Sequence, residues 1–383
     1  MTMVEIAFWL CVALIAYSYV GYPVVIWALS RIFGTAPASR PLPDDELPMV
    51  SLLIAAHNEE DIIAQRIANA LELDYPPDRL EIVIASDGSS DSTPRIVSSM
   101  ADPRIRLLAS PIRRGKAAVL NAAFRAVRGD IVLLSDANTF TDRNAVRRIV
   151  RWFADPRVGV VCGRLVLTDP ATGRNVDSLY WRYETFLKRC EGRLGALLGA
   201  NGAIYAIRRS LYTGIRSDTI VDDLVIPLIT KVRSGCSIVY DHDAVACEET
   251  PHDFGDEFNR RSRIGAGGFQ SMVRLGWLLM HGHGWVAFSF ISHKVLRWLC
   301  PFLMIGALAT NIALAGEAFY RQTLMLQLAG YGLSLLGLAT GSMASFKVLR
   351  LATMFTTMNA ALLVGFWRWA SGGQRGVWQR TAR

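Results

Sequence analysis

The sequence predicts an α/β domain with a doubly wound, largely parallel sheet, flanked by membrane-spanning helices. Short β-rich runs alternate with helical stretches from Val50 to residue 154, and long uncharged runs lie near both ends of the chain. Of the 383 residues, 51% are hydrophobic and 19% are charged, and the mean hydropathy is +0.26. This composition is too apolar for an ordinary soluble protein but carries enough charge for a folded aqueous domain.

The first uncharged run covers residues 6–30, and we expect it to be an N-terminal membrane-spanning helix. It is long enough to cross a hydrocarbon layer of roughly 30 Å. Glu5 precedes it and Arg31 follows it, whereas a cleavable signal peptide has a basic start and a shorter apolar core. Because basic flanks stay on the cytoplasmic side, we expect an integral protein of the plasma (inner) membrane, with the chain after Arg31 in the cytoplasm.

Residues 295–367 form the predicted C-terminal membrane region, with apolar runs at 297–316, 323–345 and 351–367. The basic tail, residues 368–383, contains four arginines, which favours a cytoplasmic tail. Two spans after the domain return the chain to the cytoplasm, and three do not. We therefore expect the first two runs to cross the membrane and the last run to lie in the interface or re-enter, with a third span as the alternative.

Residues 256–292 are predicted to be an interfacial amphipathic region. Three arginines, Arg260, Arg261 and Arg263, precede a set of apolar residues at helical spacing. The apolar set is Phe269, Met272, Val273, Gly276, Trp277 and Met280. A basic helix on the membrane surface fits this pattern, and packing of the stripe on the soluble domain fits it equally well.

The α/β pattern is clearest in four apolar runs, at residues 50–56, 81–86, 105–110 and 130–135. The helical stretches that follow them lie at 58–72, 91–101, 115–127 and 143–154. Parallel strands joined in this way place ligands at their carboxyl ends. The chain contains neither GxGxxG nor GxxxxGKS/T, and its six cysteines form no CxxC pair. A dinucleotide fingerprint, a P-loop and a zinc site are therefore not supported.

Polar motifs follow the predicted strands. In chain order they read AAHNEED (55–61), SDGSSDST (86–93), RRGKAAVLN (113–121), SDANTF (135–140), LLGANGAIYAIRRS (197–210) and VDDL (221–224). Asn58 and Glu59 are expected to begin a helix, and Lys116 lies at a helix start suited to anions. Asp222 and Asp223 are adjacent carboxylates. Adjacent like charges in general raise one another's pKa, which suits a general base, but such pairs also occur at ordinary helix starts.

Taken in this order, the six motifs resemble those of family 2 glycosyltransferases with a GT-A fold. The flanking apolar runs resemble the membrane-bound branch, which includes cellulose, chitin, hyaluronan and poly-N-acetylglucosamine synthases and ceramide glucosyltransferase-like enzymes. The resemblance covers about residues 48–270 and implies a cytoplasmic, Rossmann-like GT-A domain over residues 48–255. Each motif is weak by itself, and the ordered series is specific.

On the donor side, the resemblance implies that Ala55, Glu59 and Asp87 hold the base and ribose of a nucleotide and that Lys116 also binds the donor. Asp136 corresponds to the first acid of the DxD element, near the sugar and the diphosphate. A divalent cation, Mg²⁺ or Mn²⁺, is implied as a cofactor, because the leaving diphosphate accumulates negative charge that a cation neutralises.

On the acceptor side, Asp223 corresponds to the catalytic base, which removes a proton from the acceptor hydroxyl. Ala200 and Asn201 correspond to the loop beside that hydroxyl. The residues expected on the acceptor or diphosphate side also include Asp222, Arg260 and Arg263.

Two departures from the family pattern matter. Asn138 replaces the second acid of DxD, so the metal ligands would be Asp136 and a neutral amide oxygen, and we expect weaker or differently shared metal contact. The QxxRW element of polymer synthases corresponds to RRSRI, with Arg260, Arg263 and Ile264 in the Gln, Arg and Trp positions. The loss of this aromatic platform argues against a long-polymer synthase. Trp298, in HKVLRW, is expected to be an interface anchor.

The sequence therefore predicts an inverting enzyme that moves a hexosyl or N-acetylhexosaminyl group from a nucleotide-sugar donor, expected to be UDP-linked, to a lipid or glycan acceptor at the cytoplasmic membrane face. The alternatives are a processive exopolysaccharide synthase and a catalytically silent homologue that serves as a membrane-complex subunit. Anionic membrane lipids explain the net charge of +8 better than nucleic acid does, because the basic residues gather beside the apolar runs.

Overall fold

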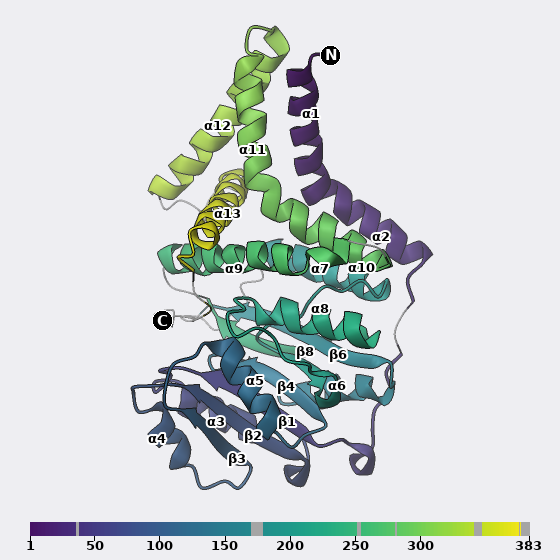
Figure 1. Ribbon diagram of the computed structural model, residues 1–383, viewed down its shortest axis with the longest axis vertical. Helices are drawn as coiled ribbons and strands as arrows, with labels where there is room; N and C mark the ends of the chain where they lie inside the picture. Colours follow the sequence, from purple (N-terminus) through teal and green to yellow (C-terminus); the bar gives the residue numbers. More distant parts are fainter. Residues whose placement is uncertain are drawn as a thin grey trace. The chain divides into compact units, whose positions relative to one another are not determined.

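The computed structural model describes residues 1–35, 38–169, 179–250, 254–279, 282–340, 347–374 and 376. The chain forms two compact units, whose elements are labelled in Figure 1. The sheet unit consists of Ile26–His252, Gly282–Val286 and Arg375–Arg383. The helical unit consists of Met1–Val25, Asp253–His281 and Ala287–Gln374. All six polar motifs belong to the sheet unit.

The sheet unit contains an eight-stranded sheet with the order β3-β2-β1-β4-β7-β6-β8-β5. The strands are β1 (Val50–Ala56), β2 (Leu80–Asp87), β3 (Ile105–Ser110), β4 (Ile131–Asp136), β5 (Phe140–Thr141), β6 (Val158–Thr168), β7 (Tyr205–Arg208) and β8 (Ser237–Glu249). Strands β3, β2, β1 and β4 pair in parallel, whereas β7 is antiparallel to both β4 and β6. Strand β8 is parallel to β6 and antiparallel to β5. The predicted parallel arrangement is confirmed for β1 to β4, and the rest of the sheet is mixed.

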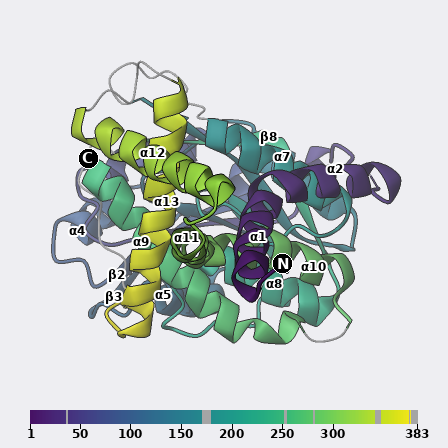
Figure 2. The ribbon, with the colours of Figure 1, turned by 90° about the horizontal axis from the view of Figure 1, so that it is seen from above.

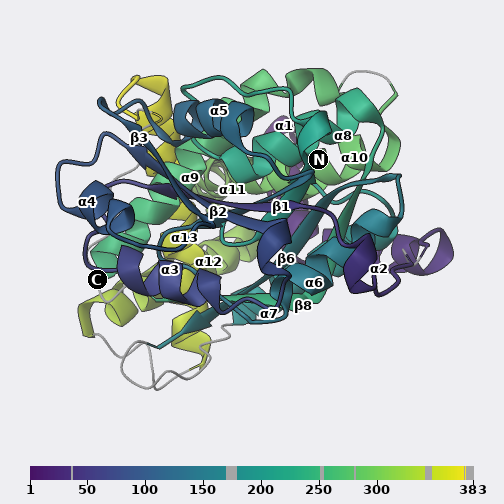
Figure 3. The ribbon, with the colours of Figure 1, turned by 90° about the horizontal axis from the view of Figure 1, so that it is seen from below.

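Helices cover both faces of the sheet because its central strands are apolar on both sides. Every residue of β1 is buried, with Leu52 and Ile54 in one hydrophobic cluster and Leu53 and Ala55 in the other. Alternate side chains of a strand leave opposite faces, so a continuous apolar run indicates a strand buried on both sides. Figure 3 shows α5 (Lys116–Ala126) and α8 (Asp222–Ser234) on one side of the sheet and α3 (Ile63–Leu71) and α6 (Ala145–Val150) on the other.

Helix α3 of the sheet unit begins later than the sequence predicts. Helix α3 starts at Ile63, and the residues before it form a turn. Asn58 adopts a φ of 56°, in the left-handed region that Asn tolerates, and its side chain accepts a hydrogen bond from Ser90 N at 2.8 Å. The prediction that Asn58 and Glu59 begin a helix is therefore wrong, because this turn joins the loop after β1 to the loop after β2.

Long helices, most of them apolar, make up the helical unit. They are α1 (Met3–Ala16), α9 (Phe254–Arg274), α11 (Leu296–Ala313), α12 (Ala318–Thr340) and α13 (Lys347–Ala370). Figure 2 shows α1 beside α11 and α12 crossing α13. Among the described residues, three helical stretches are long and apolar enough to cross a membrane: Met3–Ile32, Gly284–Ala313 and Val348–Ala370. These stretches support a membrane location for the protein.

The C-terminal candidates are not the pair of spans that the sequence favoured. The run at 351–367, expected in the interface, lies inside Val348–Ala370, whereas α12 is not among the candidates found in the described residues. The number of C-terminal spans, the side of the tail and the exact domain limits stay predictions. Residues 341–346, together with Met280, Arg375, Arg380 and Arg383, lie outside the described residues.

Part of the predicted amphipathic stripe packs inside the helical unit. Phe269 of α9 is fully buried, and its ring centroid lies 5.1 Å from that of Phe366 on α13. Trp298 is also buried, edge-to-face with Phe290 at 6.0 Å. It packs so close to Gly268 of α9 that a Cβ there would lie 2.6 Å from the indole ring. Packing within the unit, rather than anchoring at a membrane interface, therefore accounts for Trp298.

Gly163 of β6 provides a stability test for the centre of the sheet. A Cβ at this position would lie 2.7 Å from Ala244 O and 2.8 Å from a methyl carbon of Ile204. We expect Gly163→Ala to lower the free energy of unfolding by about 1–3 kcal/mol through overpacking. The matched control is Gly192→Ala on α7 (Leu179–Arg193), where the nearest atom would be 4.0 Å away.

Thermal unfolding of the purified protein in detergent measures this difference. Gly192→Ala should leave the midpoint unchanged or raise it, because alanine favours helix more than glycine does. Equal midpoints for the two variants would contradict the described packing of β6 against β8.

Candidate active site

The ends of the parallel strands bring the predicted donor residues to one edge of the sheet. In the strand register, Ala55 of β1 lies between Ala85 of β2 and Asp136 of β4. Asp87 ends β2 on the same edge. The carboxyl ends of parallel strands meet at a common edge, so the fold places three of the predicted motifs side by side.

Lys116, the first residue of α5, lies among the carboxylates at this edge. Its Nζ atom is 2.8 Å from Asp136 Oδ1 and 3.4 Å from Asp222 Oδ2. Burial acts to lower the pKa of Lys116, but the charges of Asp136, Asp222 and Asp223 outweigh burial, and the pKa is raised above its ordinary value. The ammonium group therefore stays charged and neutralises part of the acidic cluster.

The adjacent acids Asp222 and Asp223 have different surroundings. Asp222 is 6% exposed and points to Lys116, and burial raises its pKa, with Lys116 opposing and Asp223 and Asp136 reinforcing the shift. Asp223 is half-buried, and its Oδ2 atom accepts a hydrogen bond from Gly202 N at 3.2 Å. The more accessible carboxylate, Asp223, is the one that the family resemblance assigns as the base.

Gly202 lies beside two of the predicted site residues. A Cβ at this position would lie 3.4 Å from Asp136 Oδ2 and 3.6 Å from Asp223 Oδ2. The acid predicted on the donor side and the predicted base therefore approach the same point beside Gly202. Ala200 belongs to the same loop and donates its N–H to Asp223 O at 2.9 Å, which holds the loop against the start of α8.

Asp87 is fully buried, and both its carboxylate oxygens accept backbone hydrogen bonds. Oδ1 accepts from Arg114 N at 2.7 Å and Oδ2 from Gly115 N at 2.8 Å. Gly115 has a φ of 92°, which favours glycine. These bonds shape the loop that leads into α5 and so position Lys116. A contact between Asp87 and a ribose stays a prediction.

Loops after β1 and β2 also hold each other on the donor side. The N–H of Glu59 donates to Thr93 Oγ1 at 2.8 Å, and the N–H of Glu60 donates to Asp91 Oδ2 at 3.1 Å. The backbone of Glu59 is thereby held beside the end of the strands. Its predicted contact with the nucleotide, like that of Ala55, is not tested by these bonds.

Asn201 is held by two polar contacts on the acceptor side. Its Nδ2 atom donates to Gly163 O at 2.9 Å, and its Oδ1 atom accepts from Lys188 Nζ of α7. Sequence motifs did not single out Lys188, because α7 carries many charged residues and no local signal separates this one. Two further residues predicted on the acceptor or diphosphate side, Arg260 and Arg263, lie in α9 of the helical unit. Their role toward a diphosphate stays a prediction.

Arg66 is a second residue that sequence motifs missed. It is fully buried in α3, and its Nη2 atom donates to Ser135 Oγ at 3.1 Å, directly before Asp136. Burial lowers the pKa of Arg66 to about 10, while the charge of Asp136 acts in the opposite direction. The sequence offered one signal for a buried arginine. Arg66 shares a helical face with Ile63 and Ile67, and a charge on such an apolar face requires a partner.

The residues predicted to hold a metal suit a hard divalent cation. Asp136 offers a carboxylate and Asn138 an amide oxygen, which are ligand types that Mg²⁺ and Mn²⁺ accept. Gly202, which has no side chain, lies beside Asp136 Oδ2. Asn138 Nδ2 donates to Glu248 Oε1 of β8 at 2.8 Å, so a second acid lies next to the position where the family has one.

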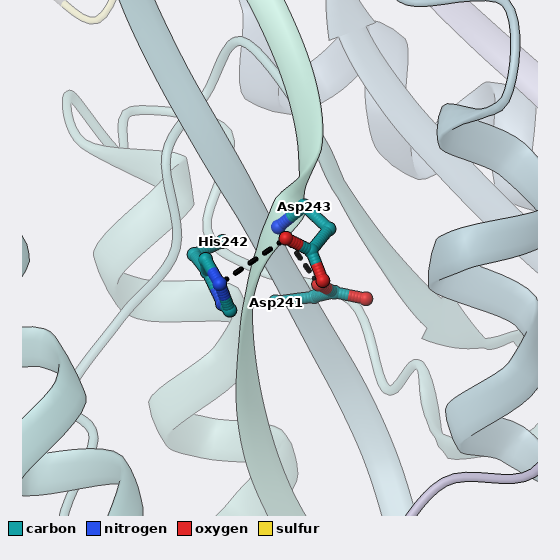
Figure 4. Close-up of side chains that lie close together, drawn as sticks. All are labelled: Asp241, His242 and Asp243. Carbon is teal, nitrogen blue, oxygen red and sulfur yellow. Dashed lines mark hydrogen bonds and ion pairs between the residues drawn. The ribbon is translucent and has the colours of Figure 1, made fainter.

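A different group of possible metal ligands lies in an irregular part of β8, at Asp241, His242 and Asp243 (Figure 4). Asp241 already accepts hydrogen bonds from Trp152 Nε1 at 2.6 Å and from Arg151 Nη2 at 2.9 Å. His242 Nε2 lies 3.1 Å from Asp243 Oδ1. The buried member of this group therefore has structural partners, and we assign no metal there.

Comparison with known families agrees with this geometry. Residues 51–213 match the family model described as glycosyl transferase family 2. The chain carries a family 2 glycosyltransferase domain. The matched residues of the glycosyltransferase domain include Asp87, Lys116, Asp136 and Asn201, whereas Asp223 lies after the matched segment.

Curated proteins similar to this chain are named for lipid and polysaccharide synthesis. Beta-monoglucosyldiacylglycerol synthase from Synechocystis sp. is 28% identical over 267 residues, which cover 66% of this chain and 55% of that protein. Poly-beta-1,6-N-acetyl-D-glucosamine synthase from Staphylococcus aureus is 27% identical over 243 residues, covering 60% and 57% respectively. The chain thus spans little more than half the length of these relatives.

A solved structure supports the fold of the glycosyltransferase domain and its flanking helices. The mannosyltransferase from Pyrobaculum calidifontis, in complex with GDP-Man and Mn²⁺, superposes with a TM-score of 0.73 at 24% identity. The superposition covers 95% of this chain and 99% of that one. The predicted GT-A fold is therefore confirmed.

The raised pKa of Asp222 gives a test of the charge arrangement at the site. A raised pKa means that the charged form is less favourable in the folded protein than in the unfolded chain, so at neutral pH this charge opposes folding. We expect Asp222→Asn to leave the thermal midpoint unchanged or raise it by about 2–4 °C, the shift that ~1 kcal/mol produces in a domain of this size.

The difference in thermal midpoint between wild type and Asp222→Asn should depend on pH. As the pH falls through the raised pKa, wild-type Asp222 becomes neutral, and the advantage of Asn should disappear. A midpoint of the variant several degrees below wild type at neutral pH would show instead that the Lys116–Asp222 pair is net stabilising, and would contradict a net cost of the Asp222 charge.

Proposed function

We propose that this protein is an inverting glycosyltransferase that moves a sugar from a nucleotide-sugar donor to a lipid or glycan acceptor at the cytoplasmic face of a membrane. The observation that carries the proposal is that the carboxylates of Asp136 and Asp223 both lie beside Gly202. A donor sugar held near Asp136 would have its anomeric carbon within reach of an acceptor beside Asp223. Lys116 keeps the acidic site partly neutral, so that an anionic donor can approach.

Asp223 acts as the general base in this proposal. Its carboxylate accepts the proton of the acceptor hydroxyl, whose oxygen bonds to the anomeric carbon while the bond from that carbon to the diphosphate breaks. The electron pair leaves with the nucleoside diphosphate, and attack from the opposite face inverts the configuration. The bond from Gly202 N to Asp223 Oδ2 orients the carboxylate and leaves Oδ1 for the proton.

Oxygens of Asp136 and Asn138 would hold a divalent cation, which stabilises the negative charge of the leaving diphosphate. The Mn²⁺ in the mannosyltransferase complex supports a cation here, and both Mg²⁺ and Mn²⁺ fit this ligand set. Lys116 would approach the same diphosphate as a point charge. Glu59 and Asp87 would contribute to the nucleotide side, and Arg263 would steady the diphosphate.

We infer that the product is a single-sugar addition to a lipid-linked acceptor. The Synechocystis relative is named for a glycolipid and the Staphylococcus relative for a polymer, so relatives alone do not choose. Ile264 stands where polymer synthases have a stacking Trp, which favours single transfer. Residues following Met3–Ile32 would lie in the cytoplasm because of Arg31 at the end of this apolar helix. A UDP-linked sugar is the donor we expect.

Replacement of Asp223 tests the proposed base. We expect Asp223→Asn to lower kcat by about a hundredfold to ten-thousandfold, the usual contribution of a general base, and to leave donor affinity nearly unchanged. Sugar transfer and the Kd of the nucleotide sugar should be measured on the same preparation. Asp78→Asn, in an exposed turn away from the site, is the control. Full activity of Asp223→Asn would show that another group is the base.

A product assay tests the metal and the acceptor class together. Purified membranes are incubated with a panel of radiolabelled UDP- and GDP-sugars, and the label is separated into lipid extract and insoluble polymer. We expect label in the lipid fraction, its loss with EDTA, and recovery with Mn²⁺ or Mg²⁺. An insoluble polymer would support the processive alternative. Binding of a nucleotide sugar without any transfer would support the silent homologue.

A further inference from the structure

Glu248 lies beside Asn138. Asn138 stands at the position where the family pattern has a second acid. We propose that Glu248 is a positioning residue that fixes the side-chain amide of Asn138, with its carbonyl oxygen directed to the cation. The inference rests on the proposed function, because it concerns the metal-binding part of that site. It assigns a role to a residue of β8 that lies outside all six sequence motifs.

Backbone pairing holds Glu248 in place. Strand β5 pairs with β8 through Phe140 opposite Cys247 and Thr141 opposite Ala246. This pairing ends at Cys247, directly before Glu248. On the other side of β8, Glu248 itself pairs with Leu167 of β6. Glu248 therefore belongs to a paired strand and not to a loop.

The chemistry of the contact determines the orientation of the amide. A carboxylate only accepts hydrogen bonds, whereas an amide has a donating nitrogen and an accepting oxygen. Asn138 Nδ2 donates to Glu248 Oε1 at 2.8 Å. Rotating the amide by half a turn would place two accepting oxygens against each other. Glu248 therefore keeps the amide nitrogen on its own side and leaves Oδ1 of Asn138 for another partner, as partners of metal ligands commonly do.

This contact predicts an unusual outcome for restoring the missing acid. Asn138→Asp would place a second carboxylate against Glu248 at hydrogen-bond distance, and like charges at this distance repel. The repulsion would turn the new carboxylate away from the position that the amide holds. We therefore expect the single replacement to bind a cation no more tightly than wild type, despite its added charge. Adding Glu248→Gln should remove the repulsion, because the side-chain amide that it introduces can donate to the new carboxylate.

The test is a double-mutant cycle read by Mn²⁺ binding. The full-length protein is purified in detergent, saturated with UDP or GDP, and titrated with Mn²⁺ while free Mn²⁺ is followed by electron paramagnetic resonance. The four proteins are wild type, Glu248→Gln, Asn138→Asp and the double variant. Glu249→Gln, which changes the exposed neighbouring acid, is the matched control. Thermal midpoints show that each variant is folded.

We expect Glu248→Gln to weaken Mn²⁺ binding by about tenfold to a hundredfold, as loss of a partner of a metal ligand does. Asn138→Asp should bind equally or more weakly than wild type, the double variant should bind at least tenfold more tightly than Asn138→Asp, and Glu249→Gln should be unchanged. Tighter binding by Asn138→Asp alone, additive effects in the cycle, or no Mn²⁺ binding by wild type would overturn the proposal.

This readout separates the inference from the proposed function. The Mn²⁺ cycle does not require transfer, so a protein that shows the expected coupling but transfers no sugar would refute the enzymatic proposal and retain the role of Glu248. A protein that transfers sugar but shows no coupling between positions 138 and 248 would do the reverse.

Discussion

The ammonium group of Lys116 makes the acidic edge of the sheet possible. Asp136 and Asp222 lie within ion-pair distance of it, and the pKa of Asp222 is still raised by burial. Removing the cation from a buried cluster of this kind leaves the carboxylates uncompensated, which costs several kcal/mol. The position of Lys116 depends in turn on Asp87, which accepts the two N–H groups directly before α5. The strand order and the loop held by Asp87 therefore place Lys116 where its charge balances the acids.

The acids of the site also differ in burial and in their hydrogen-bond partners. Asp222 is buried against Lys116, whereas Asp223 is half-buried and accepts a hydrogen bond from Gly202 N, so two neighbouring carboxylates have different environments. Arg66 supports Asp136 through Ser135, and Glu248 contacts Asn138. The site thus contains more acids than the DxD pattern suggests. The side chains of Lys116 and Arg66, together with hydrogen bonds, hold these acids in position.

Strands β1 to β4, with the motifs that follow them, and the separate helical region could be predicted from the sequence because they depend on local pattern. The run at Val50–Ala56 is apolar throughout apart from Ser51, and a strand buried on both faces requires that. The start of α3 was predicted wrongly because the left-handed Asn58 depends on Ser90, far along the chain. The contacts of Arg66, Lys188 and Glu248 were not predictable, because each depends on strand or helix packing between distant segments.

The central claim is that Asp136 and Asp223 face one reaction space, and a structure with a bound donor tests it most directly. A crystal or cryo-electron microscopy structure with Mn²⁺ and a non-hydrolysable nucleotide sugar would place the ion and the anomeric carbon. We expect the ion beside Asp136 and the anomeric carbon near Gly202, between Asp136 and Asp223, with Asp223 on the side opposite the diphosphate. A sugar bound away from Gly202, or an ion without contact to Asp136, would contradict this claim.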